Sequence, residues 1–176
     1  MQYRIFEFRL GLKYRSIVMQ TPQGERTLAV AEQAETPQDR AALAAALKAP
    51  SIYDATVDYM ARLPFSGIER RRDYTARYDR SEAVFAAWQH VYEDRERAPE
   101  LYQLGEKLVD LEDAFRRWRF AHLATVSRVI GITPGTGGSL GLQYLRAAAN
   151  QLIETPLYPE LWEVRNAMFS RDRTGA

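Results

Sequence analysis

Of the imidazole and thiol side chains that bind metals, this chain has only two histidines, because it contains no cysteine. Without cysteine, disulfides, iron–sulfur clusters, thiolate-bound zinc and cysteine nucleophiles are all excluded. Two histidines also exclude a metal site with three histidine ligands from one chain. Chemistry that needs an imidazole must therefore use His90 or His122.

His122 lies on the apolar side of a helical pattern, with Trp118 four residues before it and Val126 four residues after it. A histidine on a buried face is more often a core residue than a ligand, and the residues alone leave both interpretations open. No carboxylate lies three or four positions away to fix its tautomer, so such a partner must come from another part of the chain. His90 has polar and acidic neighbours and is expected to be a solvated helix residue.

Residues 133–138 are rich in glycine and precede Ser139 and Leu140. A P-loop needs a lysine and then a serine or threonine after its second glycine, and a dinucleotide-binding fingerprint needs a glycine where Leu140 stands, so the segment matches neither. Its amides, the Thr136 hydroxyl and the start of a following helix could together bind a small anion such as a carboxylate. A plain connection between two helices explains the composition equally well.

Three consecutive arginines at 70–72 form the longest basic run, and Glu69 and Asp73 flank them. Because charges of opposite sign are interleaved, a solvated loop with local ion pairs is favoured over a nucleic-acid patch. Residues 64–80 are expected to form this surface loop, and residues 21–24 another.

The composition is that of an ordinary globular protein. The 176 residues are 46% hydrophobic and 27% charged, with a formal net charge of +1. This charge gives no general attraction for nucleic acid or anionic lipid. The apolar runs are much shorter than the ~18 residues that a membrane-spanning helix needs, and the charged N-terminus is unlike a secretion signal. We therefore expect one cytoplasmic domain over residues 1–176, with no membrane or nucleic-acid partner.

Helix start signals recur along the chain and predict a mostly helical fold. Thr36 before Pro37 is typical of an N-cap, and Ser51 repeats the signal. The expected helices cover residues 37–48, 51–64, a segment after 81, a long segment from 99 to about 131, residues 139–150 and a short segment after 159.

The opening residues do not follow the helical pattern. Apolar and other side chains alternate there, with the apolar ones at Phe6, Phe8, Leu10 and Leu12. Such alternation is typical of a half-buried strand, so periodicity alone predicts a strand at this end of the chain.

The clearest periodicity lies in the helix expected over residues 99–130. Its apolar positions are three or four residues apart and are Leu108, Leu111, Phe115, Trp118, His122, Thr125 and Val129. Burying each large member of this row is worth about 1.5–3 kcal/mol, so we expect this helix to be central to the packing.

Several motifs occur in one order between residue 2 and about residue 166. They are Gln-Tyr-Arg-Ile-Phe-Glu-Phe at 2–8, Arg-Trp-Arg-Phe-Ala-His at 117–122, Val-Ile-Gly at 129–131, Gly-Thr-Gly-Gly-Ser at 135–139, Tyr-Leu-Arg at 144–146 and Tyr-Pro-Glu-Leu-Trp at 158–162. This combination closely resembles the C-terminal part of the tryptophan 2,3-dioxygenases, heme enzymes that open the indole ring.

The resemblance implies an all-α, heme-binding domain of the tryptophan/indoleamine dioxygenase type, in which the opening segment is a helix. It implies that His122 is the axial ligand of a heme b iron, that Arg4 binds the substrate carboxylate and that Thr136 contacts the amino-acid end of the substrate. A guanidinium fork and a hydroxyl beside turn amides both suit such a zwitterion. The implied reaction inserts both atoms of dioxygen at the C2–C3 bond of L-tryptophan and releases N-formylkynurenine, in a homotetramer.

Family members carry an N-terminal portion, with a distal-side histidine, ahead of the segment that residues 2–8 resemble. This chain is therefore expected to be truncated, and no catalytic residue is assigned within it. In the glycine turn, Pro134 stands where a basic residue is usual and Leu140 where a small or polar one is usual. Two alternatives stay open: a non-catalytic helical subunit, which the sequence upstream of Met1 tests, and a related heme-dependent aromatic amino-acid hydroxylase, which product analysis tests.

Overall fold

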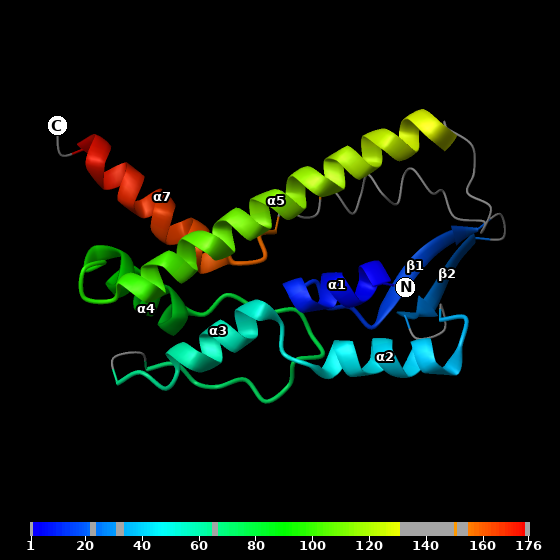
Figure 1. Cartoon of the computed structure of the whole chain (residues 1–176), viewed down its shortest axis with the longest axis horizontal. Helices are drawn as coiled ribbons and strands as arrows, with labels where there is room; N and C mark the ends of the chain where they lie inside the picture. The colour runs from blue at the N-terminus through cyan, green and yellow to red at the C-terminus, as the bar shows by residue number, and fades with distance from the viewer. Residues whose placement is uncertain are drawn as a thin grey trace.

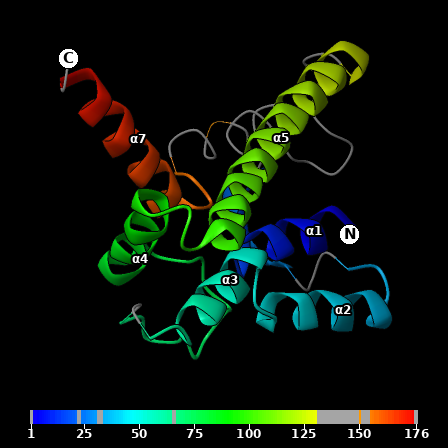
Figure 2. The same cartoon turned by 60° about the vertical axis from the view of Figure 1, so that its left-hand side comes forward.

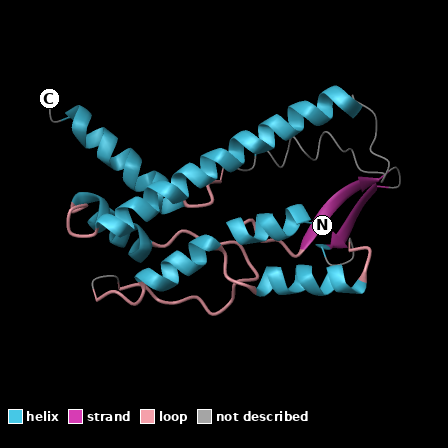
Figure 3. Ribbon diagram, in the orientation of Figure 1, coloured by secondary structure: helices cyan, strands magenta, loops and turns pink. Residues whose placement is uncertain are grey.

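Helices make up nearly all of the regular structure (Figures 1 and 3). The computed structural model describes residues 2–21, 24–30, 34–64, 67–130, 150 and 155–174. Their elements are α1 (Gln2–Leu10), β1 (Ser16–Thr21), β2 (Gly24–Ala29), α2 (Pro37–Lys48), α3 (Ile52–Met60), α4 (Glu82–Glu93), α5 (Pro99–Ile130) and α7 (Pro159–Thr174). The helical fold class predicted from the sequence is confirmed, with one hairpin added to it.

The hairpin joins β1 and β2 as an antiparallel pair. Its register places Ser16 opposite Ala29 and Thr21 opposite Gly24. The loop expected at residues 21–24 therefore coincides with the turn end of this pair, and Pro22 and Gln23 lie outside the described residues.

The caps of α2 and α3 form as the sequence predicts. The Thr36 side chain accepts a hydrogen bond from the Asp39 amide. Ser51 and Asp54 make a capping box, in which the Asp54 amide donates to Ser51 Oγ and the Ser51 amide donates to Asp54 Oδ2. Helix α3 ends at Met60, four residues before the proline that was expected to end it.

The strand predicted for the opening residues from periodicity is wrong, because Gln2–Leu10 is the helix α1. Phe8 is buried in a small cluster with residues of α2, whereas Leu10 is buried in the main core. Since the helix is covered on more than one side, its apolar residues do not follow a single helical stripe. Gly11, with φ of 110°, ends the helix and donates from its amide to the Glu7 carbonyl.

The main core lies where α4, α5 and α7 meet, and α5 and α7 diverge from it (Figure 2). Trp88 and Leu161 are fully buried there against Gly105 of α5. A Cβ atom on Gly105 would lie 3.1 Å from the Trp88 ring and 3.2 Å from Leu161, so a larger residue here would require these neighbours to shift by a few tenths of an ångström.

The apolar row of α5 is buried only in its first part. Leu108 and Phe115 lie in the core, whereas Trp118 is 39% exposed and Val129 is 77% exposed. The expectation that the whole row is buried is therefore wrong beyond Phe115. The exposed part of the row is instead where the candidate site lies.

Two buried carboxylates hold the core segments together. Glu112 of α5 accepts hydrogen bonds from the amides of Leu157 and Tyr158 and from Trp162 Nε1, at 3.0–3.2 Å, and pairs with Arg116. It thereby fixes the start of α7 to the middle of α5.

Glu160 of α7 is the second of these carboxylates. It accepts hydrogen bonds from the Tyr53 and Tyr78 hydroxyls and from the Ser81 amide. These bonds join α3, the segment before α4 and α7 around one fully buried carboxylate.

Residues 67–80 contain neither helix nor strand. Arg71 does not make its short ion pair with the neighbouring acidic residues but with Asp54 of α3, at 2.6 Å, where the aspartate side chain is 1% exposed. Tyr74 donates a hydrogen bond to Asp58 of the same helix. The segment is thus held to α3 by charges that local spacing does not show.

Among the described helices, none combines the length and apolar character that crossing a membrane requires.

Candidate functional site

His122 lies on α5 at the end of a row of stacked rings. Its imidazole is 5.5 Å from the Trp118 ring, between centroids, with an interplanar angle of 9°. Trp118 is in turn stacked on Phe115, at 5.7 Å and 11°. The three rings are one helical turn apart, so the helical spacing itself aligns them.

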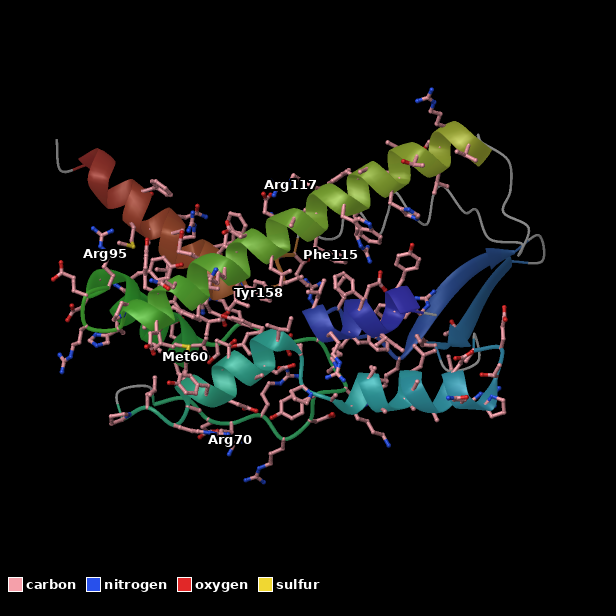
Figure 4. The ribbon with its side chains drawn as sticks, viewed as in Figure 1. Met60, Arg70, Arg95, Phe115, Arg117 and Tyr158 are labelled. Atoms are coloured by element: carbon pink, nitrogen blue, oxygen red, sulfur yellow. The ribbon has the colours of Figure 1, made fainter. Side chains whose placement is uncertain are left out.

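Helix α1 covers this row with aromatic side chains of its own. Tyr3 stacks on Trp118 at 5.5 Å and lies 6.1 Å from the His122 ring, and Phe6 meets Phe115 edge to face. Figure 4 shows Phe115 on the side of α5 that faces α1. These contacts place the first residues of the chain against residues more than a hundred positions later.

A pocket of about 500 Å³ lies between α1 and α5. Its lining is mostly aromatic or aliphatic and consists of Tyr3, Phe6, Leu111, Ala114, Phe115 and Trp118. The volume is within the range of small-molecule and cofactor pockets. An apolar pocket with flat aromatic walls suits a flat, apolar ligand.

His122 is half-buried beside this pocket. Within the described part of the chain its ring contacts are those with Trp118 and Tyr3, and no hydrogen bond engages either imidazole nitrogen. The described residues also hold no group of three or more potential metal ligands. A single imidazole next to an aromatic pocket is the donor set that suits an axial ligand of heme, so the residues present fit that group.

Arg4 lies on α1, next to Tyr3, and is half-buried. Its Nη1 donates a 2.5 Å hydrogen bond to the Tyr14 hydroxyl, which donates a 2.5 Å bond to Glu7 Oε2. The other carboxylate oxygen of Glu7 pairs with Arg119 of α5. Arg119 precedes His122 by three residues, so a continuous chain of polar contacts joins the Arg4 guanidinium to the helix that carries His122.

The structure thus brings two of the three sequence-predicted site residues to one pair of helices, Arg4 on α1 and His122 on α5. The third, Thr136, lies outside the described residues, as do Pro134, Leu140 and the rest of the glycine turn. His90, the other histidine, is exposed on α4. It lines no part of the pocket.

Sequence reasoning missed the residues that connect these two helices. Tyr14 lies in none of the quoted motifs, and nothing in the motifs at 2–8 and 117–122 indicates that Glu7 and Arg119, 112 positions apart, form a pair. Tyr3 and Phe6 did leave a signal, because they are three residues apart and share one face once the segment is taken as a helix.

Comparison with known proteins gives one consistent result. A family model described as tryptophan 2,3-dioxygenase matches residues 1–168. Proteins named tryptophan 2,3-dioxygenase are 43% identical in Polaromonas sp. strain JS666, over 93% of this chain and 51% of the relative, and in Pseudomonas aeruginosa, over 94% and 52%. One from Bradyrhizobium sp. is 43% identical over 95% and 55%. The chain spans about half the length of the curated relatives it matches.

Proposed function

The chain belongs to the tryptophan 2,3-dioxygenase family, and on this premise we propose that it carries the heme-binding and substrate-carboxylate-binding residues of an enzyme that converts L-tryptophan to N-formylkynurenine. The observation that supports this most is the pairing of α1 with α5. Helix α1, which carries Arg4, packs against α5, which carries His122, and the aromatic pocket lies between the two helices.

In this proposal the neutral imidazole of His122 would hold the iron of a heme b. The rings of Trp118 and Phe115 and the two aromatic residues of α1 would form an apolar wall beside the bound group. When bound, the heme supplies the dioxygen activation that no amino-acid side chain provides.

The substrate is held at its polar end by Arg4. A guanidinium presents paired N–H donors that match a carboxylate. Helix α1, which carries Arg4, also contributes Tyr3 and Phe6 to the apolar pocket, whose lining suits an indole ring. Thr136 is proposed as a second contact, to the amino-acid end of tryptophan. The role proposed for Arg4 and Thr136 is therefore to orient the substrate.

Dioxygen is the second substrate, and the active assembly is proposed to be a cytoplasmic homotetramer. Large apolar side chains exposed in this chain, among them Tyr3, Phe6, Val129 and Phe169, support burial against further protein. The lack of cysteine is in keeping with a reducing compartment.

The test begins with hemin added to the purified chain. We expect a Soret band that His122→Ala removes and that His90→Ala, at the exposed histidine of α4, leaves unchanged. The heme-loaded protein is then given tryptophan under reducing, aerobic conditions, both as this chain and as the full product of its gene. N-formylkynurenine is the expected product.

Other outcomes of this test would contradict different parts of the proposed function. A Soret band that survives His122→Ala would overturn the ligand assignment. Heme binding without any product, even from the full gene product, would favour the non-catalytic alternative. Hydroxylation of an aromatic amino acid in place of ring opening would favour the related hydroxylase.

A further inference from the structure

We propose that Tyr14 is a positioning residue for Arg4, which fixes the guanidinium in the orientation that binds the substrate carboxylate and links that orientation to α5. This inference rests on the proposed function, because it takes Arg4 as the carboxylate-binding group. Tyr14 itself touches neither the pocket nor the His122 ring among the contacts of the described residues.

The Tyr14 hydroxyl acts as both an acceptor and a donor of hydrogen bonds. Tyr14 accepts a 2.5 Å hydrogen bond from Arg4 Nη1 and donates one of the same length to Glu7 Oε2. Because a hydroxyl that donates to a carboxylate becomes a better acceptor, the two bonds strengthen each other. These two bonds connect Arg4, through the neutral phenol of Tyr14, to the Glu7 carboxylate.

The neutral anchor matters for anion binding. Because the phenol is neutral, the hydrogen bond from Arg4 Nη1 to Tyr14 does not offset the charge of the guanidinium. The negative charge of Glu7 is met instead by Arg119, on the other side of the carboxylate.

The Tyr14 ring is held so that its hydroxyl has a fixed position. Phe8, which is fully buried, packs edge to face against it at 5.2 Å between centroids. The preceding residue, Lys13, is anchored by three hydrogen bonds from Nζ to the carbonyls of Ala46, Leu47 and Ala49 at the end of α2. The backbone and the ring of Tyr14 are thus both fixed independently of the substrate.

The pair of Glu7 and Arg119, at the other end of this series of polar contacts, is equally well defined. The side chains of Glu7 and Arg119 are 13% and 12% exposed, so solvent screens their pair only weakly. The Arg119 guanidinium also lies 5.1 Å from the ring of Phe115, a residue of the pocket wall. A guanidinium that is already oriented loses less conformational freedom when the substrate carboxylate binds.

The test compares L-tryptophan with tryptamine, which has the same indole and amine but no carboxylate. Binding of each to the heme-loaded protein is measured by calorimetry, for wild type, Tyr14→Phe and Glu7→Gln. Tyr14→Phe retains the ring against Phe8 and removes only the hydroxyl. We expect both variants to bind tryptophan about tenfold more weakly and to bind tryptamine as the wild type does.

A control variant and the comparison of the two ligands separate positioning from a merely structural role. Tyr59→Phe, at an exposed tyrosine of α3, should leave both dissociation constants unchanged. A variant that weakens tryptophan and tryptamine equally, or changes neither, would overturn the role of Tyr14 while leaving Arg4 in place. If the wild type itself does not prefer tryptophan over tryptamine, the carboxylate role of Arg4 fails, and both the proposed function and this inference fail with it.

Discussion

The imidazole of His122 lies almost parallel to the indole of Trp118, with 5.5 Å between the ring centroids. The two residues are four apart on α5, so the helix itself sets this arrangement. Since the described contacts of His122 are ring contacts, the orientation of its nitrogen atoms depends on Trp118 and Tyr3.

Replacing Trp118 is therefore expected to weaken heme binding without abolishing it. Trp118→Leu removes the flat surface that orients His122, and such ring contacts are worth about 0.5–1.5 kcal/mol, or up to roughly tenfold in affinity. A hemin titration followed at the Soret band measures the change. Trp118→Phe, which restores a flat ring, should recover most of the affinity, and equal affinity in all three proteins would contradict the prediction.

Arg4→Ala is expected to cost about 2–5 kcal/mol in tryptophan binding, because a buried carboxylate would lose its charged partner. Arg4→Lys should recover only part of this, since an ammonium cannot present the paired donors of a guanidinium. Arg9→Ala, at the exposed arginine of the same helix, is the matched control. A loss below about 1 kcal/mol for Arg4→Ala would count against its contact with the carboxylate.

Glu112→Ala should lower the free energy of unfolding by about 3–5 kcal/mol, because two buried amides, an indole N–H and Arg116 would lose their acceptor. Urea denaturation measures this directly. The control is Asp113→Ala, one residue along, whose ion pair with Arg117 is exposed and should be worth at most about 1 kcal/mol. Similar losses for the two variants would show that burial of Glu112 is not the cause.

Alkaline pH should destabilise the fold. Burial, aided by neighbouring carboxylates such as Glu160, raises the pKa of Tyr53, Tyr78, Tyr92 and Tyr158 above the ordinary value of 10.0. The folded chain thus keeps protons that the unfolded chain releases. The resulting stability is complete below about pH 10 and is lost as the pH rises above it. Urea unfolding at increasing pH should show this decrease, and constant or rising stability would contradict it.

Tyr158→Phe isolates one part of that effect. The Tyr158 hydroxyl is buried and has no hydrogen-bond partner in the part of the chain that the structure describes. Its removal should leave stability at neutral pH unchanged or slightly higher, and it should make the decrease above about pH 10 shallower.

Some elements could be predicted from the sequence because short-range interactions determine them. Thr36 and Ser51 cap their own helices within three residues, and the spacing along α5 defines that helix directly. The hairpin also left a signal, since two short runs with β-branched residues flank Pro22 and Gly24, although the helical pattern elsewhere dominated the prediction.

Other features depend on long-range contacts that leave no local pattern. The pairing of Glu7 with Arg119 joins residues 112 positions apart, and nothing near either one predicts its partner. The roles of Arg4 and His122 came from the resemblance and not from spacing. Their assignment to substrate and heme stays a prediction, as does the role of Thr136.

Helix α5 runs without a break from Glu112, which holds the start of α7, to His122, which faces α1. The directions in which Glu112 and His122 project around the helix axis are therefore fixed relative to each other. Inserting a single residue between them would rotate everything beyond it by about 100° and shift it by about 1.5 Å, which turns His122 away from Tyr3 while Glu112 keeps its partners. The stretch between Glu112 and His122 can accept new side chains on its exposed face, as at Arg117. Its length is fixed, because it must contact α7 at one end and α1 at the other.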